Sequence, residues 1–102
     1  MGNILLVERR VLQYRLVLTC ERGLVEIDVS HLPDLRPGDV YQVWMRKGEE
    51  LQPSVLFVPS RDGTAKVVLP AETGSADEML VTREPSGGSQ EPTSAPLVSA
   101  TL

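Results

Sequence analysis

Apolar and polar residues alternate with a period of two along most of this chain, which is the pattern of half-buried β-strands. The longest run predicts a strand over residues 12–20, with apolar side chains at Leu12, Tyr14, Leu16, Leu18 and Cys20. A second run covers residues 25–30, after a predicted turn at Glu21, Arg22 and Gly23. The two runs therefore predict an antiparallel hairpin with one apolar and one polar face, in which Cys20 is buried.

Residues 40–45 form the stretch around which we expect the fold to be organised. They are rich in β-branched and aromatic residues and include Trp44, the only tryptophan of the chain. Proline and glycine precede them and a charged turn follows, so they are bounded as a strand. Tyr41 and Trp44 fall on opposite faces, which indicates a central strand. We expect Trp44 to be packed, with a ligand-stacking role as the alternative.

Shorter alternating runs complete the prediction of strands. They cover residues 54–58, 64–69, 78–84 and 97–102. A turn is expected at residues 47–53, a hairpin turn at Asp62-Gly63, and a loose loop at residues 70–77. Residues 4–7 fit either a short first strand or the end of a helix. The expected fold is all-β: an antiparallel, immunoglobulin-like β-sandwich of about seven strands.

Size and charge limit the classes of protein that fit. The 102 residues suffice for one domain with its own core, and a net charge of −4 without a basic patch argues against a nucleic-acid partner. One cysteine cannot form an internal disulfide. No run spans a bilayer, so for a domain outside the cytoplasm an export signal or anchor would lie upstream. We expect residues 1–13 to be a membrane-proximal linker or first strand, and residues 14–102 to be the domain.

Few residues offer catalytic or metal-binding chemistry. His31 is the only histidine, which is too few for a blue-copper or multi-histidine zinc site. Ser30 and Asp34 are its neighbours, but no nucleophile elbow accompanies them, so we expect a solvated imidazole. Glu49 and Glu50 are adjacent on a turn, where carboxylates point apart and stay hydrated. We therefore expect no catalytic residue, no cofactor, no metal ion and no enzymatic activity.

The Gly87-Gly88 pair lies in a segment rich in glycine, serine and proline. It lacks the spacing and the lysine of a phosphate-binding loop. Glycine is needed where a backbone approaches a bulky side chain, so we expect Gly88 to lie against Trp44 on the outer face of its strand.

Four blocks follow one another in the chain, at residues 31–44, 56–63, 67–70 and 81–93. The first ends in Tyr-Gln-x-Trp, and the last contains Glu-Pro-x-Gly-Gly-Ser. In this order they resemble the C-terminal domain of anti-sigma-K factors of the RskA type, although His31 stands where that family usually has glycine. The matching residues, expected to be mainly structural, are Leu32, Pro33, Tyr41, Gln42, Trp44, Phe57, Pro59, Asp62, Gly63, Leu69, Pro70, Glu84, Pro85, Gly87, Gly88, Pro92 and Thr93.

The resemblance implies an extracytoplasmic sensory or regulatory domain of a membrane-anchored anti-sigma factor. Such a protein negatively regulates an extracytoplasmic-function sigma factor and is released by regulated proteolysis. In the full-length protein, the implied partners are a sigma factor bound by a separate cytoplasmic region, the membrane through an upstream single-pass helix, and a site-1-type protease or another extracytoplasmic protein. The alternative is a free-standing extracytoplasmic β-sandwich that binds a glycan or a protein, with Trp44 as the stacking platform.

Overall fold

The structure is a computed structural model that describes the backbone of residues 5–11, 14–21, 24–69 and 76–101, and the side chains of residues 25–69 and 76–101. The described residues form eight β-strands and no helix, which confirms the all-β prediction. The strands are β1 (Leu5–Val11), β2 (Tyr14–Glu21), β3 (Leu24–Ser30), β4 (Asp39–Lys47), β5 (Glu50–Phe57), β6 (Ala65–Leu69), β7 (Glu78–Pro85) and β8 (Val98–Thr101).

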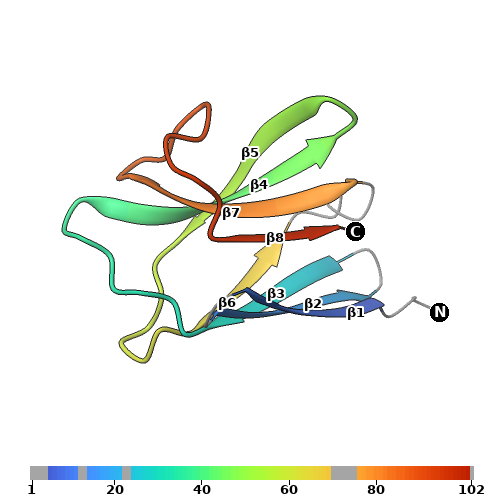
Figure 1. Ribbon diagram of the computed structural model, residues 1–102, viewed down its shortest axis with the longest axis horizontal. Helices are drawn as coiled ribbons and strands as arrows, with labels where there is room; N and C mark the ends of the chain where they lie inside the picture. The colour runs from blue at the N-terminus through green and yellow to red at the C-terminus, as the bar shows by residue number, and fades with distance from the viewer. Residues whose placement is uncertain (1–4, 12–13, 22–23, 70–75, 102) are drawn as a thin grey trace.

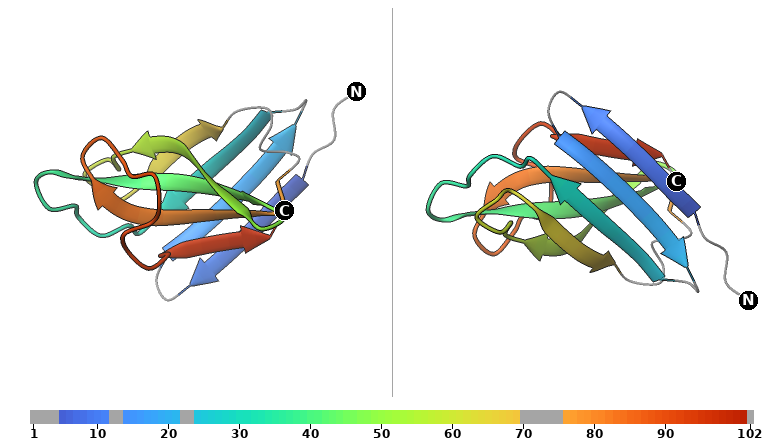
Figure 2. Two further views of the ribbon diagram at one scale, coloured as in Figure 1. Left: turned by 90° about the horizontal axis from the view of Figure 1, so that it is seen from above. Right: turned by 90° about the horizontal axis from the view of Figure 1, so that it is seen from below.

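The strands build two antiparallel sheets that lie face to face (Figure 1 and Figure 2). Sheet A has the strand order β1-β2-β3-β6, and sheet B has the order β5-β4-β7-β8. The expectation of an antiparallel β-sandwich is therefore confirmed. An immunoglobulin constant domain orders its larger sheet A-B-E-D, whereas β1, β2 and β3 are here consecutive neighbours, so the immunoglobulin-like detail is not confirmed.

Strand β4 is a central strand, as its sequence predicts. It pairs with β5 on one side and with β7 on the other. The register places Trp44 opposite Pro53 of β5 and Leu80 of β7. Between Gln42 and Trp44 the pairing with β5 shifts, because two residues of β5 oppose one residue of β4. This is a β-bulge in an edge strand.

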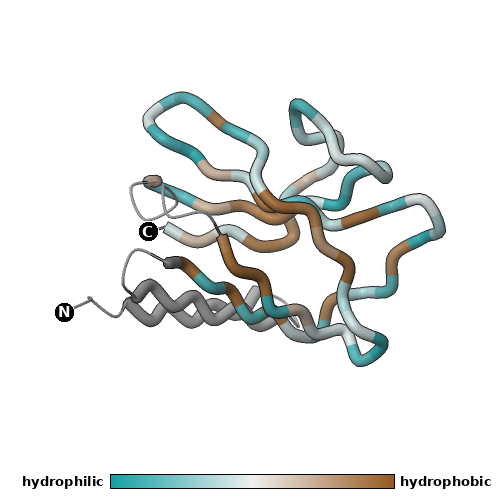
Figure 3. Tube along the Cα trace, turned by 180° about the vertical axis from the view of Figure 1, so that it is seen from behind, coloured by the Kyte–Doolittle hydropathy of each residue, from teal (hydrophilic) through white to brown (hydrophobic). Residues whose placement is uncertain are grey.

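The core lies between the two sheets and is built from alternate residues of each strand. Along β3, buried valine and isoleucine alternate with partly exposed Glu26, Asp28 and Ser30, as predicted for one apolar and one polar face. Figure 3 shows hydrophobic stretches along the strands and hydrophilic turns at their ends. The buried core residues are Val25, Ile27, Val29, Leu32, Tyr41, Val43, Val67, Leu69, Met79, Val81, Val98 and Ala100.

Strand β5 begins earlier than its sequence predicts. The expected turn at residues 47–53 is only the two residues Gly48 and Glu49, since Lys47 already pairs with Glu50. Gly48 adopts a positive φ of 62°, which a tight hairpin requires. Proline argues against a strand interior, but Pro53 is tolerated because β5 is at the edge of its sheet.

The expected hairpin around Asp62-Gly63 was also wrong. The turn is present, but the strands on either side of it belong to different sheets: β5 pairs with β4, and β6 pairs with β3. The turn therefore carries the chain from sheet B to sheet A. Its sequence specified the local reversal and not the pairing partner, which depends on the free edge that β3 offers.

Three predictions concern positions outside the described part of the chain. These are the turn at Arg22 and Gly23, most of the loop at residues 70–77, and the burial of the Cys20 side chain. The backbone register is described at Cys20, which is opposite Val25 in the β2–β3 pair. Two possibilities were left open at residues 4–7; residues 5–7 lie in β1, which pairs with β2, so the strand is the correct one.

Candidate functional site

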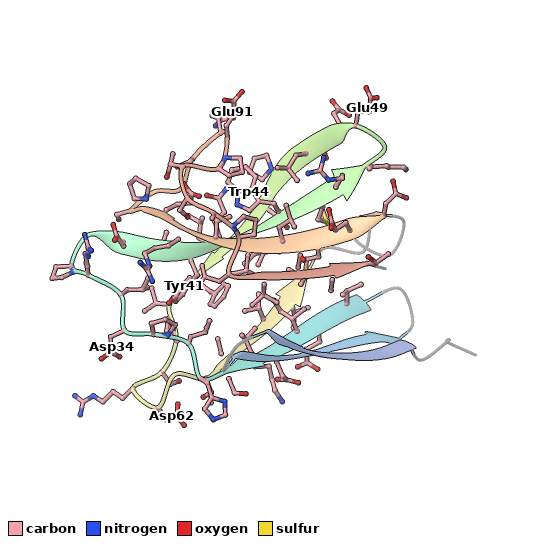
Figure 4. The ribbon with its side chains drawn as sticks, in the orientation of Figure 1. Asp34, Tyr41, Trp44, Glu49, Asp62 and Glu91 are labelled. Atoms are coloured by element: carbon pink, nitrogen blue, oxygen red, sulfur yellow. The ribbon has the colours of Figure 1, made fainter. Side chains whose placement is uncertain are left out.

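The motif residues predicted from the sequence gather in two clusters, and β4 contributes to both. Because successive side chains of a strand point to opposite faces, Tyr41 faces sheet A while Trp44 faces away from it. Figure 4 shows Trp44 on the outer side of sheet B, under the segment that follows β7. We call residues 87–96 of this segment the strap. We call the outer cluster the clasp, made of Gln42, Trp44, Thr82, Glu84, Ser89 and Thr93.

A chain of hydrogen bonds along β4 and β7 forms the floor of the clasp. The Trp44 indole Nε1 donates to Thr82 Oγ1 at 2.7 Å, and Thr82 Oγ1 donates to Glu84 Oε2 at 2.5 Å. Thr82 and Glu84 share the outer face of β7 because they are two residues apart. Trp44 and Thr82 are 0% exposed and Glu84 is 1% exposed, so this outer face is a second buried interior.

The burial of Trp44 decides between the two roles expected for it. Its side chain is packed, as predicted, and its only hydrogen-bond donor is already bonded to Thr82. A stacking platform for a glycan needs an exposed ring face. The alternative in which Trp44 is such a platform is therefore wrong for this structure.

The strap supplies the remaining partners of the Glu84 carboxylate. Ser89 Oγ donates to Glu84 Oε1 at 2.8 Å, and Thr93 Oγ1 donates to the same oxygen at 2.6 Å. The Thr93 backbone N–H lies 3.1 Å from each carboxylate oxygen. The Gln42 amide bonds both backbone groups of Ser89, accepting from its N–H at 2.9 Å and donating to its carbonyl at 3.1 Å. Glu84 and Gln42 thus join strap and sheet.

The clasp favours the ionised form of Glu84. Burial alone raises the pKa of this carboxyl, but hydrogen bonds from Thr82, Thr93 and Ser89 outweigh burial and hold the pKa below its ordinary value of 4.5. All of these partners are donors, and an ionised carboxylate is an acceptor only. The carboxylate is therefore held in its charged state by neutral groups.

Gly88 does approach a side chain closely, but the neighbour expected from the sequence was wrong. A Cβ atom on Gly88 would lie 2.9 Å from Leu56 Cδ2 and 3.1 Å from Gln42 Oε1, and Trp44 is not among its nearest neighbours. The backbone φ of 80° also favours glycine. The start of the strap therefore lies against Leu56 of β5 and the Gln42 amide, while Trp44 is fully buried on the same face of sheet B.

The second cluster joins the loop before β4 to the turn before β6. The Leu32 backbone N–H donates to the Gly63 carbonyl at 3.0 Å, and the Tyr41 hydroxyl donates to the Pro33 carbonyl at 2.7 Å. A Cβ atom on Gly63 would lie 2.8 Å from the Leu32 carbonyl oxygen, so only glycine fits. The Tyr41 ring stacks on Phe57 with centroids 5.6 Å apart. These contacts fix the connections between the sheets.

Asp62 shapes the turn at this second cluster. Its Oδ1 accepts from the Thr64 hydroxyl at 2.7 Å and from the Thr64 backbone N–H at 3.2 Å. The hydrogen bond from the Thr64 side chain is the main cause that lowers the pKa of Asp62. Both residues are exposed, so we assign this carboxylate to turn formation.

The other motif residues lie outside the two clusters. Leu69 is 1% exposed and belongs to the core, and Pro85 ends β7. Gly87 has a φ of 92° beside the close approach of Gly88, and Pro92 lies on the exposed part of the strap. Pro59 lies between β5 and the turn. Pro70 is outside the described residues.

His31 and its neighbours form no reactive arrangement. The His31 side chain is exposed, as expected for a solvated imidazole, and Asp34 is exposed as well. His31 is the non-glycine residue with a positive φ, at 64°, among the described residues. That left-handed conformation explains physically why glycine suits this position.

Thr82 and Ser89 complete the clasp; they lie in the last of the four resembling blocks but were not selected as motif residues. Thr82 lies between Leu80 and Glu84 on one face of β7, and a polar residue in that position reads as solvent-exposed. The sequence did offer one indication of these contacts: the glycine-rich segment contains several hydroxyl side chains, and Ser89 and Thr93 follow the Glu84 carboxylate by five and nine residues. That signal required knowing that the segment folds back.

Two open pockets lie on the described surface. One, of about 400 Å³, is lined by Asp28, Ser30, Thr64 and Lys66 among others. The other, of about 220 Å³, lies between β5 and the start of the strap, where the Ser54 hydroxyl is buried without a hydrogen-bond partner. Within the described residues, no group of three histidine, cysteine or acidic side chains could hold a metal ion.

The described residues also contain no helix with the length and hydropathy needed to cross a membrane.

The fold and the two clusters define a β-sandwich domain whose motif residues are engaged in packing and hydrogen bonding with one another. We compared the chain with models of known protein families to identify this class. The chain belongs to the family described as anti-sigma-K factor rskA, C-terminal, whose model matches residues 11–97. It is therefore a domain of the anti-sigma factor type, as the resemblance indicated. Searches of curated proteins and of solved structures found no match.

Proposed function

We propose that this chain is the extracytoplasmic regulatory domain of a membrane-anchored anti-sigma factor that negatively regulates an extracytoplasmic-function sigma factor. The observation that carries the proposal is the family match over residues 11–97. In the full-length protein, a cytoplasmic region separate from this domain binds the sigma factor. A single upstream helix anchors the protein in the membrane.

The structure supports a mechanism in which the domain acts as a folded body. The motif residues of both clusters contact one another, so they maintain the fold and present no open reaction centre in the described part of the chain. A compact sandwich next to the membrane restricts the access of a protease to the chain that tethers it. Removal of the domain by a site-1-type protease then starts the regulated proteolysis that releases the sigma factor.

The charge of the domain fits this role. With a net charge of −4, the chain lacks the positive field that binding to nucleic acid requires. Regulation of transcription is therefore assigned to the sigma factor, and this domain acts through protein contacts.

The experiment uses the full-length protein in its own host. Alkaline phosphatase fused after residue 102 is expected to be active, because that enzyme folds only outside the cytoplasm. Deleting the domain while keeping the anchor is expected to change expression from a sigma-dependent reporter. An inactive phosphatase fusion would overturn the extracytoplasmic location. An unchanged reporter would overturn the regulatory role.

A further inference from the structure

We propose that the strap, residues 87–96, is an acid-sensitive lid that opens as a unit from the outer face of sheet B and exposes Trp44 while both sheets remain folded. The strap is a property of the domain itself. It exists whatever the rest of the full-length protein does.

The attachments of the strap differ from those of the strands. Its bonds to the sheet use side chains: Ser89 to Gln42 and Glu84, Thr93 to Glu84, and Ser94 to the backbone of Arg83. Backbone-to-backbone bonds hold only its two ends: the Ser86 N–H donates to Gly38 and the Gly88 N–H donates to Pro85 at the end of β7, and the Leu97 N–H donates to Val81 just after the strap. Opening between these two points therefore breaks no bond of a strand ladder.

The composition of the strap makes its hydrophobic attachment weak. Its sequence is Gly-Gly-Ser-Gln-Glu-Pro-Thr-Ser-Ala-Pro, which contains no large aliphatic or aromatic residue. Gln90, Glu91, Pro92 and Thr93 are exposed. Apolar burial scales with the apolar area removed from water, so polar contacts provide most of the attachment. In the left panel of Figure 2, the strap crosses over β4 and β7.

Glu84 is the group on which most of these contacts converge. Its two oxygens accept from Thr82, Ser89 and both donors of Thr93. A protonated carboxyl becomes a donor itself and cannot accept from all of them. Protonation therefore weakens several strap contacts at one time.

Of the charged groups near the strap, Glu84 is the one whose protonation we expect to open it, because the others pair elsewhere, lie on the opposite face or are exposed. On the same outer face, Arg46 of β4 and Glu78 of β7 pair with each other at 3.1 Å, toward the other end of the strands. Asp39 of β4 and Arg83 of β7 alternate to the opposite face. Glu91 of the strap is exposed. Among the described residues, the ion pairs do not include Glu84.

The direction of the pH effect follows from the clasp. In the closed state the hydrogen bonds hold the pKa of Glu84 below its ordinary value of 4.5, and in the open state they are absent. The charge of Glu84 therefore favours closure above about pH 4.5. This contribution is lost as the pH falls through the closed-state pKa, with a slope of at most about tenfold in the closed-to-open ratio per pH unit.

The single tryptophan makes the test specific to this site. Acrylamide quenching of Trp44 fluorescence is measured on the 102-residue chain between about pH 7 and pH 3, and far-UV circular dichroism is recorded in parallel. We expect quenching to rise below about pH 4.5 at a pH where the β-sheet signal is retained. Quenching that rises only together with loss of the sheet signal would overturn the proposal.

Matched variants separate acid sensitivity from simple weakening of the strap. Glu84→Gln is expected to make Trp44 accessible at neutral pH and to abolish the pH step. Ser94→Ala removes a strap bond that does not involve Glu84, so it is expected to raise quenching at every pH and keep the step. If Glu84→Gln does not fold, Ser89→Ala and Thr93→Val are expected to reduce the step. A pH step of unchanged size in the clasp variants would overturn the proposal.

Discussion

In both sheets of this sandwich, every second side chain of a strand points to the outer face. The outer face of sheet A is open to solvent, whereas that of sheet B is covered. On the outer face of sheet A, Glu26 and Asp28 are partly exposed and Val68 is 58% exposed. On the outer face of sheet B, Trp44 and Glu84 are fully buried. Periodicity shows which side chains share a face of a sheet. It does not show whether another part of the chain covers that face.

The charged groups of the two faces differ in the same way. On sheet A, Lys66 lies 3.8 Å from Glu26 and 4.0 Å from Asp28, and all three side chains are exposed to solvent. Exposed pairs of this kind contribute little, typically 0–1 kcal/mol. On sheet B, Glu84 is held by short bonds from neutral donors in a buried setting, where hydrogen bonds to a charged group are stronger. Equivalent substitutions on the two faces should therefore have different effects.

The largest difference is expected from removing the apolar residue of each face. Trp44→Ala leaves a cavity under the strap and removes the hydrogen bond that Thr82 Oγ1 accepts, so we expect a loss of about 3–5 kcal/mol in the free energy of unfolding. Val68→Ala on sheet A is the matched change, with an expected effect within about 0.5 kcal/mol. Urea denaturation followed by circular dichroism measures both. Similar losses for the two variants would contradict the contrast between the faces.

The next comparison is between two glutamates. Glu84→Ala removes the shared acceptor of Thr82, Ser89 and Thr93, and we expect a loss of about 3 kcal/mol at neutral pH. Glu26→Ala removes only an exposed partner of Lys66, with an expected loss below about 0.5 kcal/mol. Thermal unfolding of the two variants in one buffer provides the measurement. A Glu84→Ala variant as stable as Glu26→Ala would show that the clasp does not stabilise the fold.

The neighbouring residues Gly87 and Gly88 allow a comparison within the covered face of sheet B, since only Gly88 lies against another part of the chain. Gly87→Ala and Gly88→Ala both place a side chain at positive φ, which costs about 1–2 kcal/mol. Only Gly88→Ala also displaces Leu56 or the Gln42 amide, since a Cβ on Gly87 meets nothing within 4 Å. We expect an additional loss of about 0.5–1.5 kcal/mol for Gly88→Ala, because a displaced side chain leaves its preferred rotamer. Equal losses in urea denaturation would place the strap farther from β5.

The smallest effect is expected at a position remote from both outer faces. His31 adopts a φ of 64°, and its side chain is exposed. His31→Gly relieves the left-handed strain but increases the freedom of the unfolded chain, so we expect a net stabilisation of roughly 0.5 kcal/mol. A differential scanning calorimetry comparison with the parent chain checks this. A destabilised His31→Gly variant would mean that the imidazole makes a contact worth more than the strain.

The features of the fold that depend on local sequence were predictable. Strand β4 was expected to be central because Tyr41 and Trp44 place bulk on both faces, and the alternation along β3 was expected to give one buried face. The start of β5 was missed because Pro53 reads as a breaker, and only its place at a sheet edge makes it acceptable. The partner of β6 was missed because Asp62-Gly63 specifies a reversal and leaves the choice of sheet open.

The clasp was partly predictable for a different reason. Gln42, Trp44, Glu84, Gly88 and Thr93 were selected by resemblance, which showed that they belong to a common pattern but not that they meet in space. Their meeting depends on the strap folding back over β4. The close approach of Gly88 was expected but with the wrong neighbour, because Leu56 lies opposite Gln42 on β5 and no local pattern shows that the strap reaches this pair.

The bulge and Pro53 on β5 also bear on how this molecule behaves beside other copies of itself. An outermost strand with regular, unpaired amide groups is a template for another chain, and such pairing leads to aggregation. Here β5 carries one extra residue between Pro53 and Leu56, which interrupts the regular spacing of its amide groups, and Pro53 has no amide hydrogen to donate. The β5 edge of the sandwich is consequently a poor template for pairing with a strand of another copy.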